Sequence, residues 1–265
     1  MISPLASIHP NAKIGDQVHI DPFVTIHEDV VIGDHSRISS GAVIYDGARI
    51  GSHVQIFPGA VISAVPQDLK YGGEITTAEI GSHSIIREYV TINKGTKAAG
   101  RTIVGEHTLL MAYVHIAHDC SVGSHCILAN GVTLAGHIII DDYAIIGGLS
   151  AIHQFCHIGG HVMIQGGALI GKDVPPFVKA GKFPLSYLGV NSVGMKRRGY
   201  SDSKISEVQE IYRLLFVKGF AYQKALELIE TQIPPSAERN EIIQFARTST
   251  RGLMKGLRGA EEAEE

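Results

Sequence analysis

Residues 5–64 read LASIHP NAKIGD QVHIDP FVTIHE DVVIGD HSRISS GAVIYD GARIGS HVQIFP GAVISA when they are divided into hexads. The fourth place of every hexad, from Ile8 to Ile62, is isoleucine, and the second place is Ala, Val or Ser. The same phase continues with aliphatic residues to Ile170. Three positions break it: Asp68, Glu74 and Ala98. A period of six matches neither the period of a helix nor a simple two-residue alternation, so the sequence predicts a repeat architecture.

The hexads have the composition of short strands joined by tight corners. β-branched isoleucine occupies the invariant place, and Gly, Asp or Asn falls near the hexad ends. Three hexads make an 18-residue coil, and stacked coils about 4.8 Å apart bury a continuous column of isoleucines. We therefore expect an all-β solenoid, a parallel β-helix with three strands per coil, over residues 1–173. Residues 65–76 and 95–101 lose the inward aliphatic residue and are expected to form loops that project from the coil.

The hexad register then ends, and a different organisation follows. Residues 174–190 contain Gly and Pro and are expected to form a linker. Apolar residues recur with a helical period behind a polar start at Ser201, and further helices are expected over 221–231 and 236–247. The sequence thus predicts a small C-terminal α-helical domain over residues 191–265.

Composition and charge exclude several classes of protein. The chain has 265 residues, with 23 Lys and Arg against 26 Asp and Glu. The formal net charge of −3 gives no global basis for binding nucleic acid. No uncharged apolar run is long enough for a membrane span, and the N-terminus lacks the pattern of a secretory signal. Three cysteines, none in a C-x-x-C pair, suit a reduced, cytoplasmic protein.

Coil arithmetic brings several chemically active residues to one corner. Residues 18 positions apart lie one above another, so His118 lies beneath Gly136 and Gly136 beneath Gln154. Asp119 lies beneath His137 in the same way. Two further histidines flank this edge: His115 and His153. A histidine beside a carboxylate and a glycine N–H is a minimal arrangement for acyl transfer to a hydroxyl. The alternative is a structural edge whose corner residues satisfy one another.

Two other pairs of histidines are 18 positions apart, His35 with His53 and His107 with His125, and each pair is expected to stack. Stacked imidazoles could bind a metal ion, but no third ligand is evident at either pair. The sequence therefore predicts no metal site.

Five segments carry a resemblance to a known family: QDLKY (67–71), HIAHDC (115–120), ILANGVTLAGH (127–137), IGGLSAIHQFC (146–156) and GVNSVGMKRRG (189–199). A hexapeptide solenoid followed by helices is similar to the left-handed β-helix acyltransferases. The segments resemble in particular the acyl-[acyl-carrier-protein]–UDP-N-acetylglucosamine O-acyltransferases. The resemblance implies a left-handed parallel β-helix and no cofactor. It also implies transfer of a 3-hydroxyacyl chain from acyl carrier protein to the 3-hydroxyl of UDP-N-acetylglucosamine, the first step of lipid A biosynthesis.

The same resemblance implies roles for individual residues. His118 would be the general base for the sugar 3-hydroxyl, Asp119 would orient it, and the N–H of Gly136 would serve the thioester oxyanion. The substrate groove would be lined by His115, His137, His153 and Gln154, and the nucleotide sugar would contact Asp68 and Lys70 on the first loop. The uridine and phosphates would be held by Asn191, Arg197 and Arg198 of a neighbouring subunit. Arginine suits phosphate because its guanidinium can bond two oxygens at once.

Two departures from the family pattern alter the expected contacts. Val193 stands where better-known members have an acidic residue near the nucleotide base. Residues 181–189 differ from the usual version of a segment that helps to measure the acyl chain. Gly166 matches the family's chain-length determinant, and the small residues Asn130, Gly148 and Gly166 follow one another at 18-residue steps. We expect this column to accept a relatively long 3-hydroxyacyl chain.

The expected partners follow from the resemblance. The donor is an acidic carrier protein, for which the candidate basic residues are Lys179, Lys182, Lys196, Arg213 and Lys218. The family is a homotrimer with active sites between subunits, and an exposed apolar face is usually covered in an oligomer.

Four alternatives share this fold, and the sequence argues against two of them. The acceptor could be a 3-amino analogue of the sugar nucleotide. The related N-acyltransferase carries an additional N-terminal uridine-binding domain, for which hexads that begin at Leu5 leave no room. A zinc hydratase on the same β-helix needs His-x4-His, and no two histidines here are five positions apart. A catalytically silent scaffold would have no activity to lose on substitution of His118.

Overall fold

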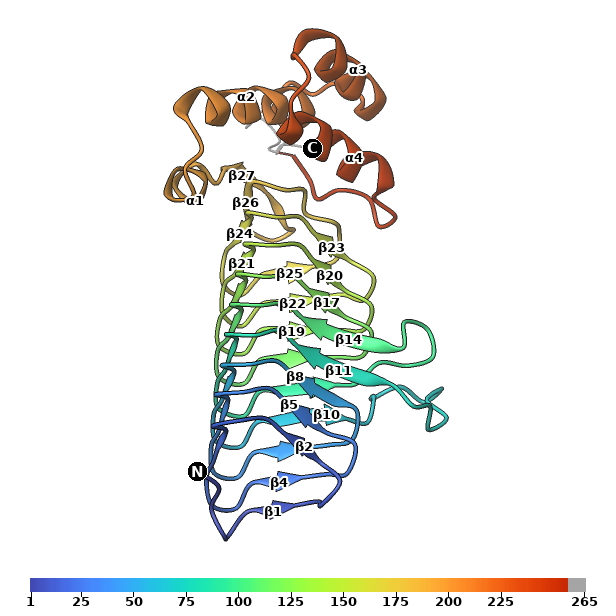
Figure 1. Cartoon of the computed structure of the whole chain (residues 1–265). Coiled ribbons are helices and arrows are strands. Elements are labelled where there is room, and N and C mark those ends of the chain that lie inside the picture. The colour runs from blue at the N-terminus through green and yellow to red at the C-terminus, as the bar shows by residue number, and fades with distance from the viewer. Residues whose placement is uncertain (257–265) are drawn as a thin grey trace.

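The computed structural model describes residues 1–256, and residues 257–265 of the predicted C-terminal domain lie outside the described part of the chain. The chain winds through three-sided coils that stack in sequence order, and helices lie over the last coil (Figure 1). This arrangement confirms the predicted parallel β-helix followed by a small helical part.

Each coil contributes one short strand to each of three sheets, here given in spatial order for residues 1–256. The first sheet contains β1 (Ser7–Ile8), β4 (Thr25–Ile26), β7 (Val43–Ile44), β10 (Val61–Ala64), β13 (Thr91–Asn93), β16 (His115–Ile116), β19 (Thr133–Leu134), β22 (Ala151–Ile152) and β25 (Leu169–Ile170). The second contains β2 (Lys13–Ile14), β5 (Val31–Ile32), β8 (Ala48–Ile50), β11 (Thr77–Ile80), β14 (Arg101–Val104), β17 (Ser121–Val122), β20 (Ile139–Ile140) and β23 (His157–Ile158). The third contains β3 (His19–Ile20), β6 (Arg37–Ile38), β9 (Gln55–Ile56), β12 (Ile85–Ile86), β15 (Leu109–Leu110), β18 (Ile127–Leu128), β21 (Ile145–Ile146), β24 (Met163–Ile164), β26 (Val178–Gly181) and β27 (Ser186–Val190).

Strand pairing follows the period predicted from the hexads. Ser7 pairs in parallel with Thr25, one 18-residue coil further on. Where the first loop intervenes the offset grows by the loop length, so that Val61 pairs with Thr91. The inward isoleucines, of which Ile38 is 0% exposed, form the core that this register keeps aligned.

The three corners of the coil are named here by one residue each. The His118 corner joins the first sheet to the second, the His125 corner joins the second to the third, and the Gly166 corner joins the third to the first. The first hexad residue at many corners has a positive φ, as at Asp119 (61°) and His137 (61°). This conformation is uncommon for non-glycine residues, and here it turns the chain sharply from one face to the next.

A column of stacked imidazoles runs along the His125 corner. His35 stacks on His53 and His107 on His125, as predicted, with ring centroids 4.7 and 4.9 Å apart. His83 fills the step between the two pairs, 4.7 Å from each neighbour. These distances match the spacing of neighbouring strands in a sheet, so the rings follow the stacking of the coils.

Both predicted loops leave the solenoid at the His118 corner, and they project from one side of it in Figure 1. The first spans residues 65–76, between β10 and β11, as predicted. The second spans 94–100 rather than 95–101, because Arg101 is already the first residue of β14 and pairs with Thr77.

Residues 174–190, expected to form a linker, instead hold the two strands β26 and β27. The first of these pairs in parallel with β24, and the second turns back antiparallel to it. Phe177 is fully buried at the start of this hairpin. The segment therefore continues the third sheet and forms the platform on which the helices lie.

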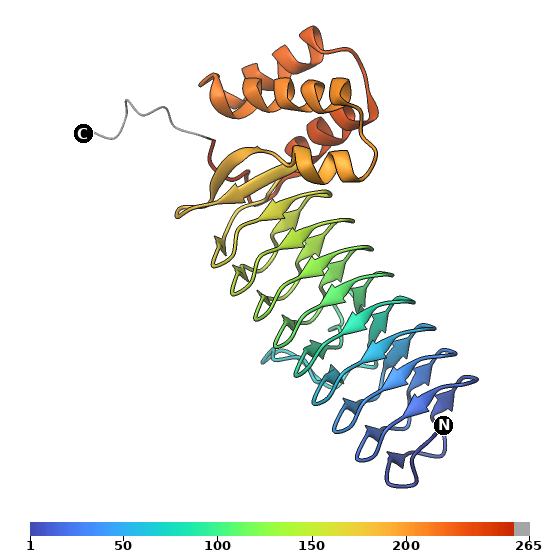
Figure 2. The same cartoon turned by 90° about the vertical axis from the view of Figure 1, so that its left-hand side faces the viewer.

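The helical part consists of α1 (Ser192–Arg197), α2 (Asp202–Tyr212), a π-helical turn η1 (Arg213–Val217), α3 (Tyr222–Gln232) and α4 (Ala237–Thr248). They cover the end of the stack in the view of Figure 2. The hydroxyl of buried Tyr212 donates to the carbonyl of Pro176 at 2.6 Å, which ties α2 to the solenoid. Within residues 1–256, no helix has both the length and the apolar character to cross a membrane.

Candidate active site

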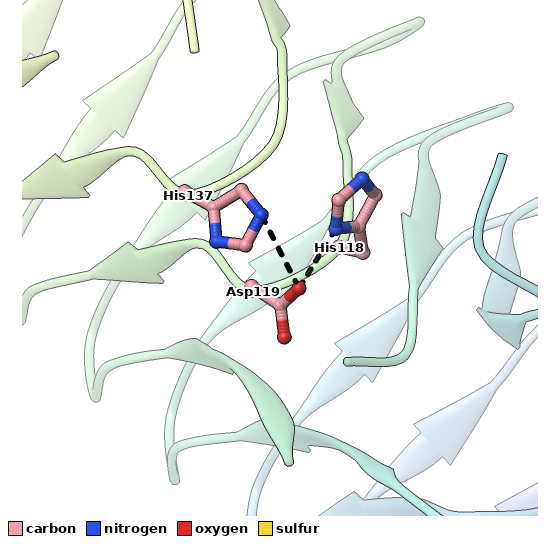
Figure 3. Close-up of side chains that lie close together, drawn as sticks. All are labelled: His118, Asp119 and His137. Carbon is pink, nitrogen blue, oxygen red and sulfur yellow. Dashed lines mark hydrogen bonds and ion pairs between the residues drawn. The ribbon is translucent and has the colours of Figure 1, made fainter. Parts of the chain in front are cut away.

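Three polar side chains meet at the His118 corner. His118 and Asp119 form the turn between β16 and β17, and His137 occupies the place of Asp119 one coil further on. Figure 3 shows the Asp119 carboxylate between the two imidazoles. His118 Nδ1 lies 2.8 Å from Asp119 Oδ2, and His137 Nε2 lies 3.7 Å from the same oxygen. The structure thus brings together side chains that coil arithmetic placed at one edge.

The contact with Asp119 fixes the tautomer of His118. An ionised carboxylate only accepts hydrogen bonds, so Nδ1 of His118 carries the proton that is donated to Oδ2. The lone pair is then on Nε2, which has no hydrogen-bond partner among residues 1–256. The His118 side chain as a whole remains 13% exposed. An imidazole held in this tautomer is a candidate general base.

The carboxylate of Asp119 is fully buried but well supplied with donors. Thr96 donates its backbone N–H to Oδ1 at 2.8 Å and its hydroxyl to Oδ2 at 2.7 Å. Burial alone raises the pKa of a carboxyl, but the hydrogen bonds from His118 and Thr96 outweigh it, and the pKa of Asp119 is lowered. Asp119 is therefore ionised at neutral pH, as the proposed tautomer of His118 requires.

Gly136 lies directly over the His118 ring. A Cβ at this position would lie 2.7 Å from His118 Cε1 and 2.9 Å from Nε2, so only glycine leaves the imidazole in place. The backbone N–H of Gly136 has no acceptor among residues 1–256. A free N–H beside Nε2 of His118 is a group that can donate a hydrogen bond to an oxyanion formed at this corner.

An aromatic ring holds His137 from the other side. His137 stacks on Phe155 at 4.7 Å between centroids, and it meets the His118 ring edge-on at 5.1 Å. Phe155 follows His137 by one coil, so the arithmetic that found His137 could also have found it. The stack fixes the plane of the His137 imidazole beside the site.

The flanking residues lie on the faces and turns next to the corner. His115 is half-buried on β16, its Nδ1 lies 2.7 Å from the Thr91 hydroxyl, and burial lowers its pKa. His153 and Gln154 are exposed one coil above Gly136, and the Gln154 side chain makes no hydrogen bond within residues 1–256. All three can reach a ligand at the corner.

The side chains of the His118 corner are only partly accessible: those of His118, Asp119 and His137 are 13%, 0% and 25% exposed. Hollows of about 510 and 520 Å³ lie at Asp141–Tyr143 and between Phe216 and Met254, away from His118. A shallower, mainly apolar hollow of about 390 Å³ lies beside His153 on the first sheet. Of the residues that the sequence resemblance places at the active site, His153 lines this hollow.

The chain matches known proteins over most of its length. Residues 173–254 match the family described as Udp N-acetylglucosamine O-acyltransferase, domain 2, and residues 11–46 and 101–136 match the bacterial transferase hexapeptide repeat. The acyl-[acyl-carrier-protein]–UDP-N-acetylglucosamine O-acyltransferase of Chlorobium phaeobacteroides is 57% identical over 192 residues, which cover 72% of this chain and 73% of that protein. The chain belongs to this O-acyltransferase family.

Solved structures of the family share its fold. The UDP-N-acetylglucosamine acyltransferase of Bacteroides fragilis 9343 matches with a TM-score of 0.94 at 51% identity, covering 96% of this chain and 100% of that one. The enzyme of Acinetobacter baumannii matches with a TM-score of 0.93 at 41% identity, covering 96% and 99%. The protein is therefore an acyltransferase built on a left-handed parallel β-helix.

Two residues expected to contact the nucleotide sugar lie on the first loop of the acyltransferase. Asp68 and Lys70 leave the solenoid at the His118 corner, and Asp68 Oδ1 accepts the Lys70 N–H at 2.9 Å. No hydrogen bond or ion pair joins either residue to His118 or Asp119 in the described part of the chain. Their expected role stays a prediction.

The three residues expected at the uridine and phosphates lie elsewhere. Asn191 is buried and caps α1, with Oδ1 accepting the Gly194 N–H and Nδ2 donating to the His161 carbonyl. Arg198 lies over the Tyr143 ring at the His125 corner and donates to the Tyr143 carbonyl at 3.1 Å. Arg197, on the same helix, is exposed. Within one chain, the structure does not bring these residues to the His118 corner.

The small residues predicted to stack do so at the Gly166 corner. A Cβ on Gly166 would lie 3.1 Å from the Gly148 carbonyl oxygen, and a Cβ on Gly148 would lie 3.1 Å from that of Asn130. This corner and the His118 corner are the two edges of the first sheet. The column is therefore one face away from the candidate base.

His118, Asp119 and His137 also offer ligand atoms within 4.8 Å of one another, so they could hold a metal ion. However, Nδ1 of His118 carries a proton toward Asp119, and Asp119 Oδ2 already accepts the Thr96 hydroxyl. We expect treatment with EDTA to leave transferase activity unchanged, and metal analysis of the untreated protein to find no stoichiometric zinc. Activity that falls with EDTA and returns with added zinc would make the trio a metal centre instead.

Proposed function

We propose that this acyltransferase moves a 3-hydroxyacyl chain from acyl carrier protein to the 3-hydroxyl of UDP-N-acetylglucosamine, with His118 as general base. The observation that carries the proposal is the short contact of His118 Nδ1 with buried Asp119, which leaves Nε2 free beneath Gly136. Family relatives with this named activity, among them one that is 57% identical over 192 residues, support the choice of substrates. The reaction would open the biosynthesis of lipid A.

The proposed mechanism needs no covalent enzyme intermediate. Nε2 of His118 takes the proton of the sugar 3-hydroxyl while the oxygen attacks the thioester carbonyl carbon. A C–O bond forms, and the carbonyl electron pair moves to the oxygen, which accepts a hydrogen bond from the Gly136 N–H. When the C–S bond breaks, the carrier thiolate leaves and takes the proton from His118. Asp119 stays ionised and stabilises the imidazolium between these steps.

The first sheet offers a route for the acyl chain. Its outward side carries the aligned residues His115, Thr133, Ala151 and Leu169 between the His118 and Gly166 corners. The mainly apolar hollow beside His153 lies on this face. A hydrocarbon that leaves the thioester carbon at His118 can cover this face and reach Gly166, which supports the proposed role of Gly166 in chain length.

Replacing Gly166 by Met should shorten the preferred donor. The methionine side chain would fill space that glycine leaves at the end of this route, and its Cβ needs only a small shift of its neighbour. The measurement is the product mass with carrier proteins charged with 3-hydroxyacyl chains of several lengths. Activity retained with a short donor shows that the site is intact, and an unchanged length profile would exclude the assignment.

The acceptor is tested in the same assay. UDP-N-acetylglucosamine and its 3-amino analogue are offered separately to the purified protein with one donor. An O-acylated product supports the proposed function, and efficient acylation of the amino sugar alone would favour the alternative acceptor. No acyl product from either would overturn both.

We further propose that the acyltransferase works as a homotrimer with active sites between subunits. The partial exposure of His118 and His137, and an exposed apolar column at the Gly166 corner, support a second surface that covers both corners. This column consists of Phe23, Tyr89, Tyr113 and Leu149, which are 55% to 77% exposed. Sedimentation equilibrium should give a trimer, and a monomer with full activity would rule the assembly out.

The proposed donor site and compartment rest on charge and cysteine chemistry. Five basic residues at the helical end are exposed and suit an acidic carrier protein: Lys179, Lys182, Lys196, Arg213 and Lys218. The cysteines at 120, 126 and 156 are buried free thiols, and burial raises their pKa, which suits a reducing compartment such as the cytoplasm.

A further inference from the structure

The support of the Asp119 carboxylate comes mainly from one residue of the second loop. Thr96 donates twice, through its N–H to Oδ1 and through its hydroxyl to Oδ2. The N–H of Ala99 adds a longer bond to Oδ1 at 3.3 Å. The Asp119 side chain is 0% exposed, so water does not substitute for these donors.

The loop holds Thr96 in place independently of Asp119. The carbonyl of Thr96 accepts the N–H of Gly100 at 2.7 Å, and the Thr76 hydroxyl donates to the Gly95 carbonyl at 2.6 Å. The N–H of Gly95 donates to the carbonyl of Thr77 on β11. Thr96 itself is only 6% exposed. The donors are thus fixed before the carboxylate meets them.

The hydroxyl and the imidazole share one oxygen. Asp119 Oδ2 accepts the Thr96 hydroxyl at 2.7 Å and His118 Nδ1 at 2.8 Å, while Oδ1 faces the loop backbone. This division sets the rotation of the carboxylate, because each oxygen has its own donors. A carboxylate free to rotate would hold the His118 ring less firmly and in more than one orientation.

We propose that Thr96 is a positioning residue of the acyltransferase, which fixes the Asp119 carboxylate and, through it, the orientation of the His118 ring. The proposal rests on the proposed role of His118. Thr96 does not touch the reacting atoms in this arrangement. Its effect on the reaction passes through Asp119.

The test compares Thr96→Val with Thr96→Ser. Valine keeps the shape and the backbone N–H but removes the hydroxyl, whereas serine keeps it. We expect Thr96→Val to lower kcat by about 10-fold or more, with little change in KM for UDP-N-acetylglucosamine. With one donor fewer, the Asp119 carboxylate orients the imidazole less well, but its less neutralised negative charge favours the protonated form of the ring. The acidic limb of the kcat/KM profile should therefore move to higher pH, and Thr96→Ser should restore both values.

Thr108→Val provides a matched control. Thr108 is 1% exposed, and its hydroxyl donates to the Gly123 carbonyl at 2.9 Å, away from Asp119. It should lower stability without moving the pH profile. If Thr96→Val unfolds at the assay temperature, Thr96→Ala takes its place with the same two measurements.

The outcomes separate the two proposals. A wild-type kcat and pH profile in Thr96→Val, with His118→Ala inactive, would overturn the positioning role and leave the general base in place. An equal pH shift in Thr108→Val would overturn it as well, because the effect would not be specific to Asp119. An active His118→Ala would instead overturn the proposed base.

Discussion

Replacing His118 by Ala is expected to lower kcat/KM for acyl transfer by at least about 10²-fold, the usual range for loss of a general base. The methyl group cannot accept the proton of the sugar hydroxyl, and the thioester would face a neutral, weak nucleophile. The alanine side chain leaves the Asp119 carboxylate with its bonds from Thr96, so the corner should keep its fold. Steady-state kinetics with carrier-protein donor and UDP-N-acetylglucosamine measure the effect.

His125→Ala is the matched control for this experiment. His125 is an exposed histidine one corner further along the same coil, stacked on His107 and on Tyr143. It should keep wild-type kinetics, because its imidazole lies outside the candidate site. Equal activity of His118→Ala and the wild-type enzyme would show that another group removes the proton.

Replacing Gly136 by Ala is expected to lower kcat by at least about 10²-fold as well. The new methyl group would displace the His118 ring, and misplacement of a catalytic group by about 1 Å has an effect of this size. The methyl carbon would lie 2.7 Å from Cε1, well inside contact distance, and the backbone above it is part of a fixed coil. Kinetics and thermal unfolding are measured together. The expected result is a lost rate with a small change in melting temperature.

Gly160→Ala is a close control, since Gly160 has the same place in its hexad at the His125 corner. A Cβ there would lie 3.1 Å from the Asp142 carbonyl oxygen, and no catalytic side chain lies beneath it. It should be folded and active. If Gly136→Ala keeps full activity, the His118 ring does not occupy its present position during the reaction.

The solenoid could be predicted from the sequence because the fourth place of almost every hexad holds an aliphatic residue, and this repeat sets the register of the coils. An aliphatic residue at nearly every sixth position, isoleucine throughout residues 8–62, fixes the inward side of each strand, and the 18-residue coil then places distant residues one above another. The meeting of His118, Asp119 and Gly136 followed from this arithmetic alone. The stacked histidines of the His125 corner followed in the same way.

The features that the sequence did not predict depend on contacts between residues that are not related by the 18-residue repeat. Thr96 was missed because its loop leaves the coil, so that counting from Asp119 does not lead to it. The hairpin of β26 and β27 was missed because its strands pair through the backbone without the hexad pattern. The cap role of Asn191 and the docking of Arg198 on Tyr143 arise from long-range packing of α1, which the sequence does not encode locally.

The hairpin and helices over the last coil also decide how far the stack can grow. Every coil presents backbone donors and acceptors at the spacing that another coil would need. At the N-terminal end, β1 and β2 have no further strand among residues 1–256, and β3 is followed only by a bridge to Ile2. A chain that ended near residue 173 would carry such edges at both ends, and copies could join head to tail into unlimited filaments. By covering one end, the hairpin and the C-terminal helices would prevent head-to-tail growth of this kind.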